Sequence, residues 1–175
     1  MRKFRILSIL GMLCIISTSL RAQTPPPKSP CTNHPVYRQF DFWIGDWEAF
    51  GVNGKKQGDS HIERLLDSCV ILENWTGAGG YSGKSYNTFN SGTQKWQQYW
   101  VDNAGGVTEY FKGHFEDNKM IMETFNVKQQ DGKVKIMRMT FFNLGPDKVR
   151  QFGQSSADNG QTWTTDFDLE YRRKK

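Results

Sequence analysis

The sequence is poor in the residues and patterns from which several common kinds of site are built. It has three cysteines and three histidines, with no Cys-x-x-Cys pair and no paired Cys/His spacing, so no metal site is expected. No Gly-x-Ser-x-Gly motif supports a serine hydrolase. No amphipathic helical pattern of ten or more residues interrupts the chain after Phe40, which argues against an α/β fold.

The net positive charge is concentrated at the N-terminus. Residues 1–22 begin with basic residues, continue in an apolar run from Ile6 to Leu20 and end at Ala22, which is typical of a cleaved secretory signal peptide. The apolar run is shorter than the roughly 20 residues of a spanning helix, so no membrane span is expected. Four of the 23 basic residues lie in this segment, leaving 19 against 18 acidic residues. Nucleic-acid binding is therefore not expected.

The rest of the chain is predicted to be one domain in the extracellular space or the periplasm. Residues 23–33 form a Pro-rich linker, and residues 34–175 form a single β-barrel domain that starts with a helical turn over 34–39. Cys31 and Cys69 remain after cleavage, and export favours a disulfide between them. Two free thiols are the alternative, and no pattern indicates an oligomeric state.

Ten segments have the composition and spacing of β-strands. Turn residues such as Asn-Gly and Asp-Gly separate them, and the short breaks predict an antiparallel meander. Such a meander most simply closes on itself, so we predict an all-β, antiparallel up-and-down β-barrel of about ten strands. The segments are Trp47–Phe50, His61–Leu66, Cys69–Thr76, Ser82–Phe89, Lys95–Val101, Val107–Phe115, Lys119–Val127, Lys133–Phe142, Lys148–Ser155 and Thr162–Tyr171.

Alternation of apolar and polar residues predicts which side chains point into the barrel. In the third segment, Val70 and Leu72 are an alternative inner set, and in the sixth segment Tyr110, Lys112 and His114 are expected outside. The predicted inner sets are Cys69, Ile71, Glu73, Trp75; Trp96, Gln98, Trp100; Val107, Glu109, Phe111, Gly113, Phe115; Val134, Ile136, Arg138, Thr140, Phe142; and Trp163, Thr165, Phe167, Leu169, Tyr171.

An aromatic-rich stretch, residues 40–50, precedes the first strand. It holds five large aromatic residues in eleven positions, with Gly45-Asp46-Trp47 at its centre. The pattern indicates a short helical turn that leads into a β-strand. A tryptophan at this entry buries roughly 200 Å² and is suited to closing one end of a barrel. We therefore assign structural roles to Gly45 and Trp47.

Four motifs together resemble a family of uncharacterised bacterial secreted proteins that is similar to calycins, the lipocalin and fatty-acid-binding-protein type of barrel. They are the run from Phe40 to Glu48, the run from Cys69 to Trp75, Lys95-Trp96 with Trp100-Val101-Asp102, and Ser156-Ala157-Asp158-Asn159-Gly160. The resemblance extends from Phe40 to Tyr171. It implies an internal cavity, a small-molecule ligand and no reaction. It also implies an arginine stacked on Trp47, for which Arg150 and Arg172 are the candidates.

A further motif, Ser156-x-Asp158-x-Gly160-x-Thr162-Trp163, resembles the Asp-box hairpin of sialidase propellers. One copy does not build a propeller of several blades. We interpret the motif as a structural hairpin in which Asp158 binds turn amides, Gly160 shapes the turn and Trp163 packs.

Two kinds of chemistry are weighed against structural roles. His34, His61 and His114 raise the alternative of a haem-binding barrel, but the pattern places His114 toward solvent. Glu73 and Glu109, with Arg138 between them, could serve an enzyme as acid/base residues if they are buried. Surface positions or a satisfied buried network are the structural alternatives.

The sequence therefore predicts a secreted or periplasmic protein that binds a small lipophilic or aromatic molecule. The alternatives are an enzyme on the same barrel, a haem-binding barrel and an interaction domain with a filled interior. We assign no catalytic residue and expect no cofactor. The residues predicted to contact the ligand are Trp75, Trp96, Gln98, Trp100, Glu109, Phe111 and Arg138.

Overall fold

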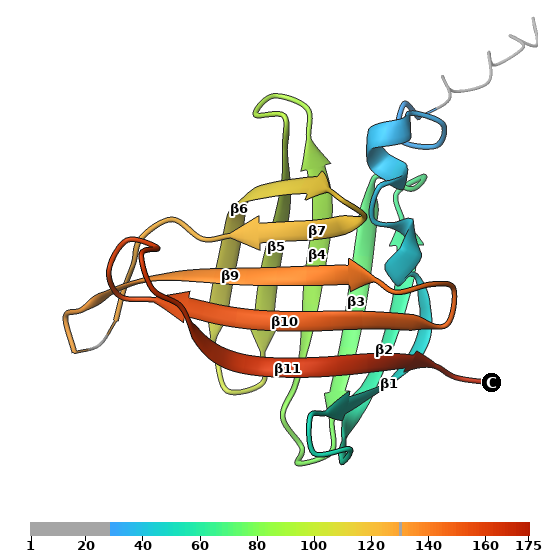
Figure 1. The fold of residues 1–175 in the computed structure, drawn as a ribbon. Helices are drawn as coiled ribbons and strands as arrows, with labels where there is room; N and C mark the ends of the chain where they lie inside the picture. The colour runs from blue at the N-terminus through green and yellow to red at the C-terminus, as the bar shows by residue number, and fades with distance from the viewer. Residues whose placement is uncertain (1–28, 130) are drawn as a thin grey trace, which may run out of the picture.

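The computed structural model describes residues 29–129 and 131–175. The predicted signal peptide at residues 1–22 and most of the predicted linker at 23–33 lie outside the described residues. Two short 3₁₀ helices precede a set of β-strands (Figure 1). The elements are η1 (Pro35–Arg38), η2 (Asp41–Trp43), β1 (Gly45–Gly51), β2 (Lys56–Leu65), β3 (Val70–Gly77), β4 (Ser82–Asn90), β5 (Lys95–Asp102), β6 (Val107–Glu116), β7 (Lys119–Glu123), β8 (Val127–Lys128), β9 (Val134–Asn143), β10 (Lys148–Ser156) and β11 (Thr164–Arg173).

The strands form a closed antiparallel barrel, as the turn spacing predicts. Each strand from β1 to β6 pairs with the next, β7 pairs with β9, and β9 pairs with β10, which pairs with β11. The barrel closes where β11 pairs with β1, which leaves ten strands in the wall and the two-residue β8 as an extension beside β9. In Figure 1, β9, β10 and β11 cross in front of β3 to β6. This architecture is compatible with a calycin-like fold.

Turn chemistry explains the tight connections between strands. Asp117 and Asn118 both have positive φ, 44° and 60°, in the two-residue turn between β6 and β7. Asp and Asn tolerate this conformation better than other side chains, and it matches the twist of the two strands. The predicted strand Lys119–Val127 differs from the structure, since β7 ends at Glu123 and Val127 begins β8.

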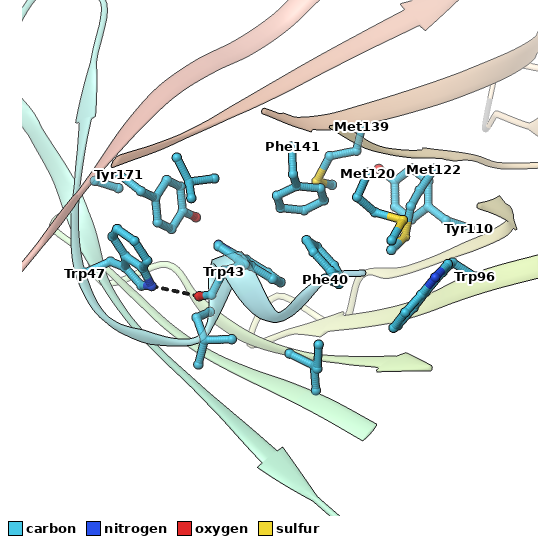
Figure 2. Packing of buried hydrophobic residues seen from close by; sticks show 14 residues of the cluster. Phe40, Trp43, Trp47, Trp96, Tyr110, Met120, Met122, Met139, Phe141 and Tyr171 are labelled. Carbon is cyan, nitrogen blue, oxygen red and sulfur yellow. Dashed lines mark hydrogen bonds between the residues drawn. The ribbon is translucent and has the colours of Figure 1, made fainter. Parts of the chain in front are cut away.

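Aromatic side chains from the N-terminal segment fill one end of the barrel (Figure 2). Phe40, Trp43 and Trp47 are fully buried, and η2 carries Trp43 into the interior. The Trp43 ring lies 4.6 Å from the Phe141 ring between centroids and 5.0 Å from the Phe40 ring. Trp47 Nε1 donates a hydrogen bond to the Trp43 carbonyl at 2.8 Å. Residues 40–47 therefore close this end, as their aromatic content indicates.

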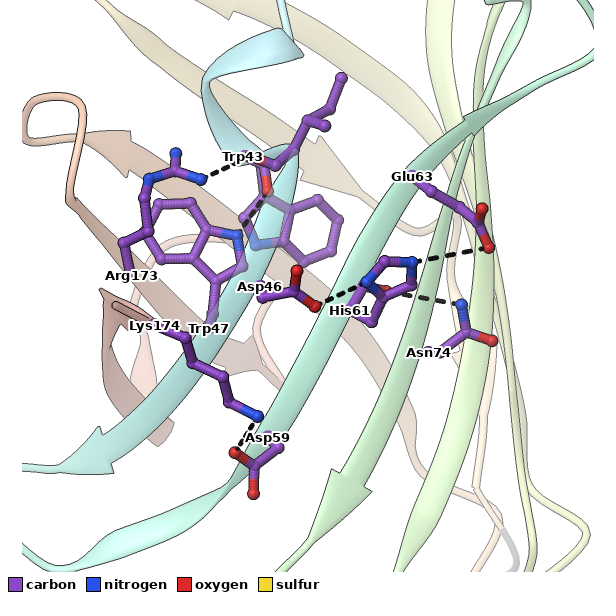
Figure 3. A network of polar contacts seen from close by, with 10 residues as sticks. Trp43, Asp46, Trp47, Asp59, His61, Glu63, Asn74, Arg173 and Lys174 are labelled. Atoms are coloured by element: carbon purple, nitrogen blue, oxygen red, sulfur yellow. Dashed lines mark hydrogen bonds and ion pairs between the residues drawn. The ribbon is translucent and has the colours of Figure 1, made fainter.

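Arg173, rather than Arg150 or Arg172, covers Trp47 from outside the closed end (Figure 3). Its guanidinium carbon lies 4.2 Å from the Trp47 ring, and Nη1 donates to the Ile44 carbonyl at 3.2 Å. Gly45 has φ of 133°, and a side chain there would collide with this guanidinium. The expectation for Arg150 and Arg172 is wrong because both stack on outer-face rings, Arg150 on Phe142 and Phe152 and Arg172 on Phe50.

A disulfide ties the lead segment to the barrel. Cys31 and Cys69 are bonded, with Cα atoms 4.8 Å apart and a sequence separation of 38. Two hydrogen bonds support the same junction: Thr32 Oγ1 to the Asp67 carbonyl at 3.2 Å and Arg38 Nη2 to the Ser68 carbonyl at 3.0 Å. Residues 31–38 are thereby held against the turn between β2 and β3.

A register shift in β6 overturns part of the predicted inner face. The pairing with β5 is irregular between Trp96 and Gln98, opposite Gly113 and Tyr110. Thr108 and Tyr110 therefore face the interior in the first half of β6, and Gly113 in the second half, where Phe115 packs against the core. The predicted inward positions of Val107, Glu109 and Phe111 are wrong, because the extra residues of the bulge change the parity.

The predicted face of β9 is reversed. Met137, Met139 and Phe141 pack in the interior, so Val134, Ile136, Arg138, Thr140 and Phe142 belong to the other parity. The pattern misled because this strand is apolar on both sides. Thr140 and Phe142 lie on the outer face, where Arg150 stacks on Phe142. The predicted inner faces of β3, β5 and β11 are otherwise correct, except that Thr165 is exposed. The residues that point inward as predicted are Ile71, Glu73, Trp75, Trp96, Gln98, Trp100, Phe167, Leu169 and Tyr171.

Candidate functional site

A cavity of about 520 Å³ occupies the barrel on the side away from the end that residues 40–47 close, which is called the aromatic plug below. This volume is within the usual range for small-molecule sites. Gly77, Gly79 and Tyr81, at the turn between β3 and β4, line its outer part. Glu73, Gln98, Tyr110, Gln151 and Tyr171 line it where the side chains are most deeply buried. The cavity thus has an entrance at the end opposite η2 and a polar floor.

Three aromatic rings lie against the cavity wall because each has a glycine of an adjacent strand beneath it. A Cβ atom built on Gly58 would lie 2.7 Å from Trp75 Cζ2, and one built on Gly83 would collide with the Trp100 ring. Gly153 has the same relation to the ring of Phe167. All three rings line the cavity from neighbouring strands. The missing side chains leave room for each ring against the wall, so the rings border the cavity and do not fill it.

A hydrogen-bond network crosses four adjacent strands at the floor. Glu73 accepts from Ser60 Oγ at 3.2 Å and from Ser85 Oγ at 2.9 Å. Ser85 Oγ in turn accepts from Asn87 Nδ2 at 3.0 Å, and Asn87 Oδ1 accepts from Gln98 Nε2 at 2.8 Å. All five residues are buried. Alternation in β2 to β5 therefore places a polar layer inside the barrel next to the apolar plug.

The direction of this network leaves one acceptor free. Asn87 Nδ2 donates to the Ile71 carbonyl at 3.1 Å, and a carbonyl only accepts, so Asn87 must present Oδ1 to Gln98. Gln98 must then present Nε2 to Asn87. Its Oε1 is buried without a hydrogen-bond partner, on a side chain that is 1% exposed and lines the cavity.

Burial raises the pKa of the Glu73 carboxyl to about 7. Desolvation is the main cause, and the hydrogen bonds from Ser85 and Ser60, together with the nearby Tyr171 hydroxyl, oppose it only in part. The Tyr171 hydroxyl donates its one hydrogen to Gln151 Oε1 at 2.7 Å, and burial beside Glu73 holds the pKa of this phenol well above its ordinary value. Glu73, Tyr171 and Gln151 thus form a second polar chain across the floor, from β3 to β11 and β10.

The charged residues around the cavity are mainly acidic. Glu73 and Asp166 line it, and Arg138 is the one cationic side chain among the lining residues. Arg138 is already paired with Glu123, with Nη2 to Oε1 at 2.6 Å and Nε to Oε1 at 2.7 Å. Its guanidinium carbon also lies 3.8 Å from the Trp163 ring. Among the described residues that line the cavity, the one cation is therefore already paired with a carboxylate and stacked on an aromatic ring.

The structure brings together only part of the predicted ligand set. Trp75, Gln98, Trp100 and Arg138 line the cavity, although Arg138 is paired with Glu123. Trp96 belongs to the closed-end core, where Nε1 donates to Gln39 Oε1 at 2.9 Å. Glu109 is exposed on the outer face. Phe111 packs 6.0 Å from the ring of Phe125, which is 57% exposed.

Most residues that line the cavity were absent from the predicted ligand set, among them the floor residues Tyr110, Gln151 and Tyr171. Tyr110 was assigned to the outer face because nothing in the sequence marks the bulge in β6. Gln151 shares the inner face of β10 with Val149 and Gly153, so the alternation of side chains in that strand would have identified it. Tyr171 was predicted to point inward but was not linked to Glu73, because β3 and β11 are far apart in sequence.

The Asp-box motif forms the turn between β10 and β11. Asp158 accepts from Thr162 N at 2.9 Å, Thr162 Oγ1 at 2.6 Å and Ser156 Oγ at 2.7 Å. These bonds, led by those from Thr162, lower the pKa of Asp158 to about 2. Trp163 Nε1 donates to the Gly160 carbonyl at 3.0 Å, so the side chain is fixed against the turn. The arrangement accords with a structural hairpin.

The histidines lie away from the cavity. His34, His61 and His114 are all exposed, and His61 Nδ1 lies 2.7 Å from Asp46 Oδ1 on the outer face (Figure 3). None of them belongs to the residues that line the cavity. Over residues 29–129 and 131–175, no three His, Cys, Asp or Glu side chains gather as a metal site would require. The haem alternative therefore has no axial histidine among the residues that line this cavity.

In the part of the chain that the structure describes, no helix has the length and apolar character needed to cross a membrane. Comparison of the sequence with models of known protein families and with curated proteins finds no match. The functional argument therefore rests on the cavity itself.

Proposed function

We propose that this protein binds a small, partly apolar molecule inside the barrel. The observation that carries the proposal is a cavity of about 520 Å³ with aromatic walls and a buried, unpartnered acceptor at its floor, Gln98 Oε1. Apolar walls with a few placed polar groups are the usual composition of a small-molecule site. An interaction domain with a filled interior accounts less well for this cavity, because its wall glycines preserve open volume.

Trp75 and Trp100 would hold the apolar body of the ligand, and Gln98 would orient its polar end. Trp75 of β3 lies against Gly58 of β2, and Trp100 of β5 lies against Gly83 of β4. Both indoles face the cavity. A flat molecule can stack on such surfaces without displacing them. Glu109 and Phe111 have no part in this site, and Arg138 remains in its pair with Glu123.

We further propose that the protein is exported and acts outside the cytoplasm. The signal-peptide pattern of residues 1–22 supports this location. The Cys31–Cys69 disulfide also supports it, because disulfides persist in oxidising compartments. Detection of the cleaved chain in the cytoplasmic fraction of its cell of origin would contradict this proposal.

Ligand binding can be tested by quenching of intrinsic tryptophan fluorescence with lipids, haem and aromatic metabolites. Any compound that binds should then be titrated against Trp100→Phe and Gln98→Ala, both of which should weaken binding with little loss of fold stability. Gln97→Ala is the matched control, because Gln97 is the same residue type on the same strand but points outward. Equal affinities for all four proteins, or no binding compound, would refute a ligand site here.

An enzyme is the second candidate, and one observation favours it. The pKa of Glu73 is raised to about 7, which suits a general acid or base at neutral pH. Glu73 lines the cavity, whereas Glu109 is exposed on the outer face. If a bound compound is converted to product, Glu73→Gln should abolish turnover while binding is retained. Unchanged turnover in that variant would exclude Glu73 as the acid or base.

A further inference from the structure

We infer that the cavity selects a molecule whose buried end is an uncharged or cationic hydrogen-bond donor, such as an alcohol or an amine, and rejects molecules that end in a carboxylate. This inference rests on the proposed function and defines its ligand class. The fatty-acid type of ligand is thereby excluded, although an apolar cavity alone would accommodate its chain.

The first argument is the orientation of Gln98. The Ile71 carbonyl fixes Asn87, Asn87 fixes Gln98, and Gln98 Oε1 is left as an acceptor. No protein group donates to this buried acceptor, so a ligand O–H or N–H that reaches it makes a hydrogen bond that the protein's own side chains do not supply. A carboxylate brings only acceptors to this position.

The second argument is electrostatic. Glu73 lies in the same polar floor as Gln98, connected through Ser85 and Asn87. Above neutral pH it would repel a ligand anion, and at any pH it supplies no positive charge. The one lining cation, Arg138, is bound to Glu123 and stacked on Trp163. A buried carboxylate needs a paired cation, and among the described residues that line the cavity the one cation already has a carboxylate partner.

The remaining floor donors do not replace that cation. The Tyr171 hydroxyl already donates to Gln151 Oε1 at 2.7 Å, and Gln151 Nε2 is directed at Met139 Sδ at 2.9 Å. Tyr110, the cross-strand partner of Gln98, is a buried neutral phenol because burial raises its pKa. A single neutral donor compensates little of the hydration that an anion loses on burial.

Four naphthalene derivatives with the same ring position substituted provide the test: naphthylmethanol, naphthylmethylamine, methylnaphthalene and naphthoate. Binding is measured by isothermal titration calorimetry at pH 7 on the oxidised, cleaved protein. We expect the alcohol and the amine to bind about tenfold or more tightly than methylnaphthalene, and naphthoate to bind most weakly. In Gln98→Met, which keeps the size but removes the acceptor, the alcohol should lose this advantage over methylnaphthalene. Gln97→Met is the control and should leave all four affinities unchanged.

The outcomes separate this inference from the proposed function. If all four compounds bind equally, or naphthoate binds best, the cavity binds ligands but the donor selection is wrong. If the alcohol keeps its full advantage in Gln98→Met while the fold is intact by circular dichroism, Gln98 Oε1 is not the acceptor. If none of the four binds to the wild-type protein, the proposed function itself is contradicted for flat apolar molecules.

Discussion

Replacing Glu73 by glutamine should change how the stability of the barrel depends on pH. Glu73 is fully buried, and its pKa rises from 4.5 to about 7 on folding. A carboxyl group with a raised pKa favours the folded state only while it is protonated. Its contribution is fully present below pH 4.5 and is lost as the pH rises toward and past 7. The variant Glu73→Gln removes this titration while keeping the shape of the side chain.

The expected size follows from the two pKa values. A difference of one pKa unit corresponds to about 1.4 kcal/mol, so the wild type should lose roughly 3 kcal/mol relative to Glu73→Gln between pH 4 and pH 8. Comparing the two proteins at each pH cancels the titration of all other groups. The hydrogen bonds of Ser60 and Ser85 to residue 73 change the offset between the curves but not this slope.

Urea unfolding with the disulfide intact, followed by tryptophan fluorescence at several pH values, measures the free energy of unfolding of each protein. Glu109→Gln is the control for the same chemical change on the exposed outer face. If the difference between wild type and Glu73→Gln varies by less than about 1 kcal/mol from pH 4 to pH 8, the carboxyl is not desolvated. The polar floor described here would then be wrong.

Three other measurements test separate parts of the structure. Trp47→Ala should lower the free energy of unfolding by about 3–5 kcal/mol, because the side chain is fully buried at the closed end, and a loss below about 1 kcal/mol would contradict that role. Mass spectrometry after alkylation without reductant should find Cys31 and Cys69 unmodified, whereas two alkylated thiols would refute the disulfide. Gly83→Ala should displace the Trp100 ring and weaken binding of any cavity ligand severalfold by titration, and unchanged affinity would show that the ring has other room.

The fold followed from local signals in the sequence. Turn residues such as Asp117 and Asn118 mark where strands end, and each break is too short for a crossover, so an antiparallel barrel is the simplest outcome. The closing of one end of the barrel could also be predicted from the sequence, because the segment from Phe40 to Trp47 is too apolar to remain exposed. These features depend on a few neighbouring residues, which is why the sequence alone was sufficient.

The site was harder to predict because it depends on parity and on contacts between distant strands. One irregularity in β6 moved Glu109 and Phe111 outside and brought Tyr110 inside. In β9, apolar residues lie on both faces, so alternation did not indicate which face is inside, and Phe142 was placed on the wrong side. The position of Arg173 over Trp47 depends on where β11 ends against β1, which no local pattern records.

The glycines beneath the cavity walls have a consequence for how such a protein can change its ligand over evolution. Gly58, Gly83 and Gly153 do not need to contact a ligand, yet each determines where an aromatic ring on the next strand can rest. One methyl group added at any of them would collide with that ring, and at Gly58 and Gly83 also with a backbone oxygen of the adjacent strand, so the cavity wall would have to shift. Ligand preference can therefore diverge between related barrels whose ligand-contacting residues are identical, and a directed-evolution library aimed at new ligands should include these hidden positions.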